Sequence, residues 1–190
     1  VTCGPTCEDI DPVRFITNRS TGKMGAALVE AAGLRGARIK VISGPVNREY
    51  APWADVIMVR SAEQMLDAVK DNLSAADVLV MAAAVADYVP ETYRTSKIKK
   101  GDKLTSLALK SSPDILSTIR PMKGDKFFVG FAAETNNLSD SARKKLVSKG
   151  LDMIVANRVG GPGTGFGSDT NSGLILTEAG VLDHFEQVEK

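Results

Sequence analysis

The sequence has very few of the residues that build metal centres and acid–base triads. Its 190 residues include two cysteines, Cys3 and Cys7, and a single histidine, His184. A structural zinc site uses four Cys or His ligands, and a disulfide framework needs more paired cysteines, so both are excluded. Two free thiols fit a reducing cytoplasm. One histidine near the C-terminus also argues against a Ser/His/Asp or Cys/His acyl-enzyme mechanism.

A dominant charge and long apolar runs are also missing. The 24 basic and 23 acidic residues give a formal net charge of +1. No overall field attracts nucleic acid, so any anion site must come from a local cluster. The apolar runs are far too short to span a membrane. A hydrophobic content of 43% with 25% charged residues is ordinary for a globular protein. We therefore expect one soluble domain over residues 1–190, and, because the first residue is Val1, one excised from a longer chain.

Helix and strand patterns alternate along the chain. Helices are predicted over 25–35, from a capping box at 61–64 to about 72, from Ser112 with Pro113 at its first position, and over 139–149. Strands are predicted at the start, over 38–43, 55–59, 77–84, 104–109, 127–131 and 152–156, and in a final hairpin around 178–180. Residues 89–101 and Gly160 to Gly167 are expected to be loops. The apolar run 77–84 is typical of a strand covered on both faces. This alternation predicts a Rossmann-like, doubly wound α/β fold with a mostly parallel sheet and helices on both faces.

Residues that follow the predicted strands are candidates for a ligand site, because such sheets bind ligands beyond their carboxyl ends. Residues 18–25 carry hydroxyls, glycines and a lysine into a helix N-terminus, which favours a phosphate. The alternative is a well-capped helix without a ligand. Asp87 ends a run of small residues and could hold a metal ion or a ribose hydroxyl, or could simply cap a turn.

Two lysine clusters are further candidates. The segment 97–100 places three ammonium groups in four residues of the predicted loop, where they could neutralise a polyphosphate or remain solvated. Lys145 and Lys149 share one face of a predicted helix and point either to a ligand or to solvent.

Taken in order, the motifs resemble those of the bacterial phosphopantothenate–cysteine ligase family along nearly the whole chain. They are Gly4-Pro5-Thr6, Asp11-Pro12-Val13-Arg14, Asn18 with Ser20 to Gly25, Ser43-Gly44-Pro45, Ala83 to Tyr88, Lys97-Ile98-Lys99-Lys100, Pro113-Asp114-Ile115, Gly130 to Thr135 and Ala156-Asn157. The Lys-x-Lys-Lys loop is similar to that of the form that uses CTP. The resemblance implies that the carboxylate of 4′-phosphopantothenate attacks CTP to give an acyl-cytidylate, which L-cysteine then converts to the amide. It also implies a magnesium ion, a homodimer with a shared site, and a flavin (FMN) only in a separate decarboxylase half of a bifunctional protein.

Site residues are carried over position by position. Asn18 matches the asparagine needed to convert the acyl-cytidylate, and Lys97 matches a lysine that contacts CTP and favours formation of the intermediate. The nucleotide site is matched by Ala83, Asp87, Lys97, Pro113, Asp114, Ile115, Leu116, Phe131, Lys145 and Lys149, with Asp87 as the magnesium candidate. Phosphate or substrate contacts are expected from Arg14, Ser20, Thr21, Gly22 and Lys23.

The sequence departs from the family's commonest pattern at Cys7, where arginine is frequent, and at Arg19 and Thr21, where His and Ser are frequent. Thr21 keeps the hydroxyl, whereas Cys7 removes a possible phosphate contact. Two other functions share the fold: an NAD(P)-dependent short-chain reductase and a non-catalytic nucleotide-sensing module. The reductase would need a glycine fingerprint and a Tyr-x-x-x-Lys pair, and the tyrosines lack a lysine at that offset.

Overall fold

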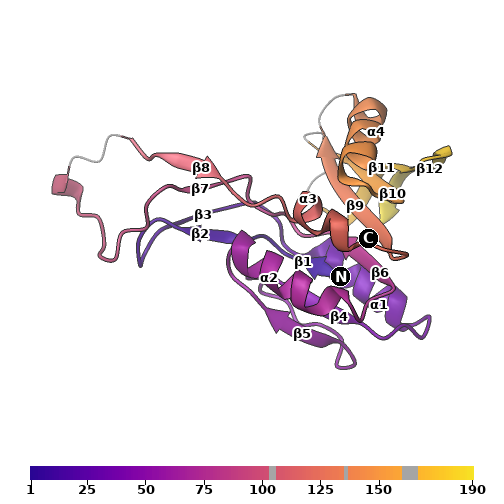
Figure 1. Ribbon diagram of the computed structural model, residues 1–190, viewed down its shortest axis with the longest axis horizontal. Helices are drawn as coiled ribbons and strands as arrows, with labels where there is room; N and C mark the ends of the chain where they lie inside the picture. The colour runs from indigo at the N-terminus through magenta and orange to yellow at the C-terminus, as the bar shows by residue number, and fades with distance from the viewer. Residues whose placement is uncertain (103–105, 135–136, 160–166) are drawn as a thin grey trace.

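A mostly parallel sheet forms the centre of the protein, as predicted. The computed structural model describes residues 1–102, 106–134, 137–159 and 167–190. Within them, eight strands pair in the order β12-β11-β10-β9-β6-β1-β4-β5 (Figure 1). Their bounds are β1 Thr2–Cys3, β4 Lys40–Ser43, β5 Asp55–Met58, β6 Val78–Met81, β9 Phe127–Glu134, β10 Met153–Arg158, β11 Thr170–Thr177 and β12 Gly180–Glu189. Neighbours from β5 to β10 run parallel, and the C-terminal hairpin β11–β12 adds two antiparallel strands.

Local signals in the sequence set the ends of the helices α1 (Lys23–Gly33), α2 (Ala62–Leu73), α3 (Ile115–Ile119) and α4 (Leu138–Lys149). The capping box of α2 is present in full, with Ser61 and Gln64 bonding each other's backbone. Gly150 ends α4 in the left-handed conformation, with φ 65°. The predicted start of α3 at Ser112 was wrong, because Asp114 caps the helix by accepting from the Ser117 amide. The Ser112 hydroxyl instead donates to the Ala86 carbonyl.

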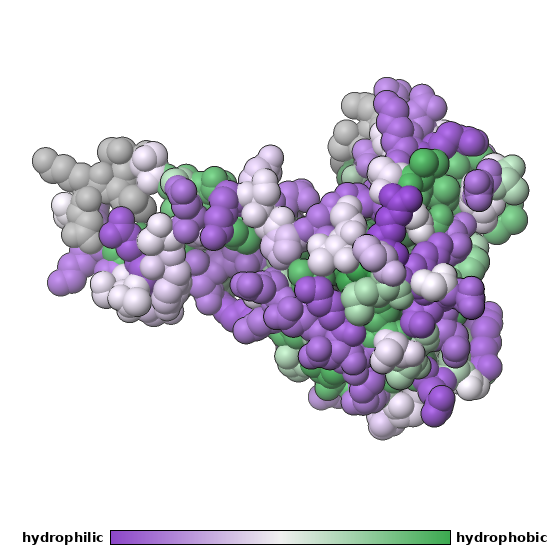
Figure 2. All heavy atoms as spheres, in the orientation of Figure 1, coloured by the Kyte–Doolittle hydropathy of each residue, from purple (hydrophilic) through white to green (hydrophobic). Residues whose placement is uncertain are grey.

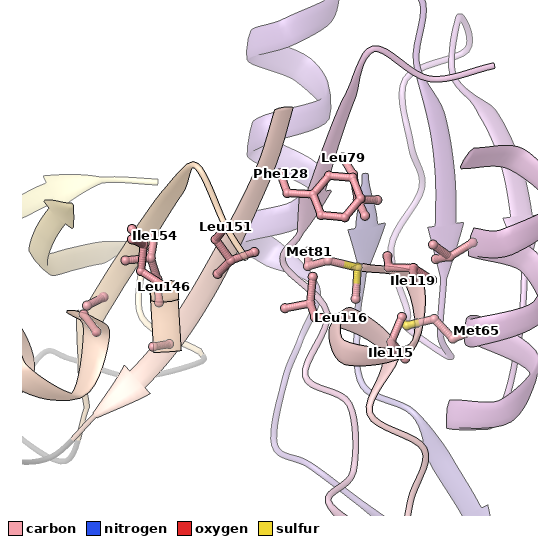
Figure 3. Packing of buried hydrophobic residues seen from close by; sticks show 14 of the residues in the cluster. Met65, Leu79, Met81, Ile115, Leu116, Ile119, Phe128, Leu146, Leu151 and Ile154 are labelled. Carbon is pink, nitrogen blue, oxygen red and sulfur yellow. The ribbon is translucent and has the colours of Figure 1, made fainter. Parts of the chain in front are cut away.

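Helices cover both faces of the sheet, but unequally. α2, α3 and α4 pack on one face, in a core that includes Phe128, Met81 and Ile154. Figure 3 shows Leu79, Met81 and Phe128 of the sheet beside Leu116 and Ile119 of α3. α1 packs on the other face through Val29, against Cys3 and Val41 of β1 and β4. The doubly wound class is therefore confirmed. Among the described residues, no helix is both long and apolar enough to cross a membrane.

The face that bears α1 is only partly covered beyond β1. We call its apolar residues on β6, β9 and β10 the open sheet face. Paired positions in register define it as Val78, Val80, Phe127, Val129, Met153 and Val155. Val78 is 53% exposed and Phe127 is 41% exposed. The prediction that the 77–84 run is covered on both faces was therefore wrong for the described part of this chain. The run itself is apolar, but periodicity alone does not tell which neighbour covers it.

Two hairpins form an arm that projects from the body of the protein (Figure 1). One pairs β2 (Cys7–Asp9) with β3 (Phe15–Thr17), and the other pairs β7 (Tyr88–Pro90) with β8 (Leu109–Ser111). Between β7 and β8, a 3-10 turn, η1, spans Lys100–Asp102, and a second, η2 (Arg120–Met122), follows α3. The prediction of an unpaired loop over 89–101 was wrong at its start, where the chain forms the hairpin. The strand expected over 104–109 begins only at Leu109, and its residues 104–105 lie outside the described ones.

Candidate functional site

A cleft of about 630 Å³ opens at the carboxyl ends of the central parallel strands. It brings together most of the side chains predicted for the site. Its lining includes Asn18, Ser20, Gly22, Lys23, Ala83, Asp87, Pro113, Asp114, Ile115, Leu116, Phe131, Lys145 and Lys149. Arg14, Thr21 and Lys97 do not line it. Most of the residues that do line the cleft follow predicted strands or begin predicted helices, and a parallel sheet brings such positions together at one edge.

The start of α1 forms one wall of the cleft. Gly22 precedes the helix with φ 72°, and its amide donates to the Ser20 hydroxyl at 3.3 Å. The next turn packs closely on β1, because a Cβ added at Gly25 would lie 2.3 Å from the Cys3 sulfur. The first turn of α1 contains no acidic residue. The Lys23 ammonium forms an ion pair with the exposed Asp169 carboxylate. The N–H groups at the start of the helix therefore give this wall the positive potential that suits an anion.

A turn of small residues after β6 forms the floor of the cleft. The Asn18 amide nitrogen donates to the carbonyls of Ala84 at 3.0 Å and Val85 at 3.1 Å. The Thr6 hydroxyl accepts from the Ala86 amide at 3.0 Å. Since both neighbours of the Asn18 side-chain nitrogen are carbonyl oxygens, its two hydrogens are used to hold the turn, and its oxygen is the group left for other contacts.

Lysines of α4 form the opposite wall. Lys145 donates to the Phe131 carbonyl at 3.2 Å. Lys149 forms an ion pair with Asp114 and donates to the Ser117 hydroxyl at 3.1 Å. Burial by itself would raise the pKa of Asp114, but the hydrogen bonds from Lys149 and Ser117 outweigh it, so that the pKa is lowered. This wall holds two ammonium groups against one carboxylate and keeps a net positive charge.

The C-terminal hairpin adds residues that the sequence did not identify. Asn171 of β11 donates to the Asn157 side chain at 2.7 Å, and both line the cleft. Lys190, at the end of β12, lines it as well. Burial and the nearby charge of Lys23 lower the pKa of Lys190, so these two cations are close enough to repel each other. Asn157 belongs to one of the motifs that carry the family resemblance but was not among the predicted site residues, and no local motif points to Asn171 or Lys190.

Of the three predicted residues outside the cleft, Arg14 and Lys97 lie on the arm. Arg14 pairs with Asp11 at 2.7 Å and donates to the Ile98 carbonyl at 2.5 Å. Lys97 is exposed next to Ile98, and Thr21 is exposed beside the α1 wall. The glycine-rich segment Gly160 to Gly167 lies outside the described residues except for Gly167.

A magnesium ion fits this cleft only together with an anionic ligand. In the described parts of the chain, no three His, Cys, Asp or Glu side chains come together as a metal site. Asp87 is exposed at the cleft and offers one carboxylate. Because magnesium is commonly held by one or two carboxylates and substrate phosphates, oxygens of a bound polyphosphate would complete its ligands.

The fold and the site together define a Rossmann-like α/β domain with a cation-lined cleft at the carboxyl ends of its parallel strands. Comparison with known proteins gives the family. The chain belongs to the DNA/pantothenate metabolism flavoprotein C-terminal domain family, whose model matches residues 1–190.

Two of the relatives are named for coenzyme A biosynthesis. The chain is 49% identical over 181 residues to the coenzyme A biosynthesis bifunctional protein CoaBC of Bacillus subtilis (strain 168), covering 95% of this chain and 45% of that protein. It is 44% identical over 177 residues to CoaBC of Escherichia coli (strain K12), covering 90% and 43%. The chain thus spans less than half the length of these two relatives. A crystal structure of a CoaBC C-terminal domain superposes with a TM-score of 0.83 at 37% identity, covering 98% of this chain and 84% of that one.

Proposed function

We propose that this chain is the ligase domain of a coenzyme A biosynthesis protein and joins 4′-phosphopantothenate to L-cysteine. The observation that carries the proposal is the cleft itself. It gathers Asn18, a small-residue turn and cations from three elements in a member of a family named for pantothenate metabolism. The two substrates of the first step are both anions, so a site that binds them together must neutralise charge.

In the first step, a carboxylate oxygen of phosphopantothenate attacks the α-phosphorus of CTP. An acyl–phosphate bond forms, the bond between the α- and β-phosphates breaks, and pyrophosphate leaves. Lys145 and Lys149 on one wall, and Lys23 with the α1 N-terminus on the other, supply positive charge to the phosphates. The backbone of the Ala83–Val85 turn is accessible because its side chains are small, which lets a ligand approach closely. Magnesium, held by Asp87 and phosphate oxygens, would offset further charge.

In the second step, the amino group of cysteine attacks the acyl carbon. The carbon–nitrogen bond forms, the bond from carbon to the phosphate oxygen breaks, CMP leaves, and the nitrogen loses a proton to solvent. Asn18 is the residue we assign to this step. It holds the carbonyls of Ala84 and Val85 in place, and its side-chain oxygen remains to meet the incoming amine.

A second copy of the chain is the partner that we propose. The open sheet face is apolar, and Figure 2 shows further apolar surface at the end of the molecule where β9 to β12 lie. Leu182 of β12 is 64% exposed. Pairing two such faces would bury them. The arm would then be available to bring Lys97 and Arg14 to a partner's cleft, since it projects from the body of the protein (Figure 1) and neither residue lines the cleft of its own chain. We also propose that the domain works in the cytoplasm beside an FMN-dependent decarboxylase half.

Pyrophosphate release tests the proposal directly. With CTP, magnesium and phosphopantothenate, the chain should release pyrophosphate, and it should form the amide only when cysteine is added. Equal turnover with ATP would contradict the choice of CTP. Oxidation of NAD(P)H by the chain would favour the reductase instead. Tight CTP binding without any pyrophosphate, in a chain shown to be dimeric, would favour a nucleotide-sensing module.

A further inference from the structure

Asp11 is a fully buried carboxylate that lies outside the cleft, at the turn between β2 and β3. We infer that Asp11 is a positioning residue, which fixes the Ile98 backbone to this turn and thereby sets where the neighbouring Lys97 is presented. The inference rests on the proposed function for the role of Lys97, but the tether itself is independent of it.

The two oxygens of Asp11 join one side of the arm to the other. Oδ1 accepts from the amides of Val13 and Arg14, both at 2.8 Å. Oδ2 accepts from Arg14 Nε at 3.1 Å and Nη2 at 2.7 Å, and from the Ile98 amide at 3.1 Å. The Asp11 side chain is 0% exposed. A buried carboxylate with five donors is held in one position, because hydrogen bonds to a charged group are among the strongest in proteins.

Arg14 completes the connection from the other direction. Its Nη2 donates to the Ile98 carbonyl at 2.5 Å, so both backbone groups of Ile98 are bound to the Asp11–Arg14 pair. The Arg94 amide adds a bond to the Ile10 carbonyl at 2.9 Å. From Glu91 to Lys100, Ile98 alone is half-buried and the other residues are exposed. The segment is therefore fastened at Ile98, next to Lys97, the lysine that we expect to contact CTP.

Burial by itself would raise the pKa of Asp11. The hydrogen bonds from Ile98, Val13 and Arg14 outweigh burial and hold the pKa well below its usual range. The Asp11 carboxylate is thus ionised at neutral pH, and the hydrogen bonds that it accepts from Ile98 and Arg14 are in place. A lysine on a fastened segment loses less freedom when it meets a phosphate, and misplacement of such a group by about 1 Å can cost about a hundred-fold in rate.

A matched control lies on the same arm. Asp9 of β2 forms a two-pronged ion pair with Arg60, with distances of 2.6 to 3.2 Å, and does not bond Ile98. Asp9→Asn removes another arginine-paired carboxylate of the arm, one that is 37% exposed, without touching the tether. Comparison of Asp11→Asn with Asp9→Asn separates positioning of Lys97 from general weakening of the arm.

The experiment combines hydrogen exchange with a double-mutant cycle. In the parent chain, the Ile98 amide should exchange more slowly than that of Lys97, which has no hydrogen-bond acceptor among the described residues. Asp11→Asn should remove this protection, and Asp9→Asn should keep it. In CTP-dependent pyrophosphate release, Asp11→Asn should lower kcat by about ten- to a hundred-fold. In a Lys97→Gln background the same change should have little further effect, because the positioned group is already gone.

Each failure has a distinct meaning. Equal slowing of the parent and of Lys97→Gln by Asp11→Asn would show that Asp11 acts independently of Lys97, and would overturn the inference. So would unchanged Ile98 exchange in a folded Asp11→Asn variant. If that variant does not fold, Asp11→Glu keeps the charge but shifts the oxygens, and its Ile98 exchange decides. A parent that releases no pyrophosphate defeats the proposed function, while the exchange result still decides the tether.

Discussion

Replacing Asn18 by aspartate tests the part of the site that we assign to the second half-reaction. The substitution keeps size and shape but puts an oxygen where the amide nitrogen donates to Ala84 and Val85. Both carbonyls then face a negative charge. The Ala84 carbonyl keeps its hydrogen bond from the Thr6 amide at 3.3 Å, whereas the Val85 carbonyl loses its donor. A buried acceptor left without a partner costs about 1–3 kcal/mol, and the Val85 carbonyl is only part-buried, so we expect the free energy of unfolding to fall by about 1 kcal/mol, with further loss from repulsion.

The same variant should separate the two chemical steps. Charge neutralisation at CTP relies on Lys145 and Lys149 and on the start of α1, so Asn18→Asp should still release pyrophosphate. Attack by cysteine should slow by about a hundred-fold, because the turn that Asn18 holds shifts when its donor becomes a carboxylate oxygen and misplacement by about 1 Å can cost that much, and the acyl-cytidylate should accumulate. Lys97→Gln should instead slow formation of this intermediate.

Urea unfolding measures the stability of Asn18→Asp, and mass spectrometry detects the intermediate. Asn18→Asp as stable as the parent would refute the assigned hydrogen bonds. Turnover at the parent rate would refute the catalytic role. Lower pH should return part of the lost stability, because a protonated carboxyl regains one O–H donor.

Three further predictions follow from packing, charge and the open sheet face. Gly25→Ala should lower the free energy of unfolding by about 1–3 kcal/mol, because its Cβ would lie 2.3 Å from the Cys3 sulfur and α1 must shift. The lowered pKa of Asp11 means that its stabilising effect is complete above the ordinary aspartate value of about 3.9 and is lost as the pH falls toward the folded value. The urea midpoint should therefore be flat near neutral pH, and Asp11→Asn should show a smaller loss in acid. Val129→Glu should convert the proposed dimer to monomers in analytical ultracentrifugation, since it places a charge on the open sheet face.

Each of these predictions has a control in the chain. Gly101→Ala adds a methyl with no atom within 4 Å and should leave the urea midpoint unchanged. Asp9→Asn should retain the acid dependence that comes from Asp11. Val147→Glu changes a residue that is 66% exposed on α4, which packs on the opposite face of the sheet, and should remain dimeric. A dimeric Val129→Glu variant, or a Gly25→Ala variant as stable as the parent, would contradict the packing described above.

Local chemistry explains which parts of the fold could be predicted. The capping box at Ser61 and the glycine at 150 fix helix ends by contacts within a few residues, so a short window of sequence contains the whole signal. The cleft residues could also be placed, because parallel strands end at one edge of the sheet. The β2–β3 hairpin was missed because each strand has only three residues, too few to show a period.

The other misses come from contacts between distant segments. Ser112 and Asp114 are both good caps, and the choice between them depends on the Ala86 carbonyl, which binds the Ser112 hydroxyl. Asn171 and Lys190 reach the cleft only through the pairing of the C-terminal hairpin with β10. The side of the sheet that remains uncovered depends on where α1 packs, which the apolar run at 77–84 does not encode.

The contribution of the C-terminal hairpin to the cleft has a consequence for the synthesis and folding of the protein itself. In a growing chain, α1 and the turn of small residues after β6 are made early. Asn171 and Lys190 join the cleft only after β11 and β12 have been made and paired. Ligand binding stabilises only the states that bind, so a nucleotide would favour the finished domain over earlier folding intermediates. The substrate would thus act as a selective stabiliser of completed chains, and those cut before the hairpin would lack this protection.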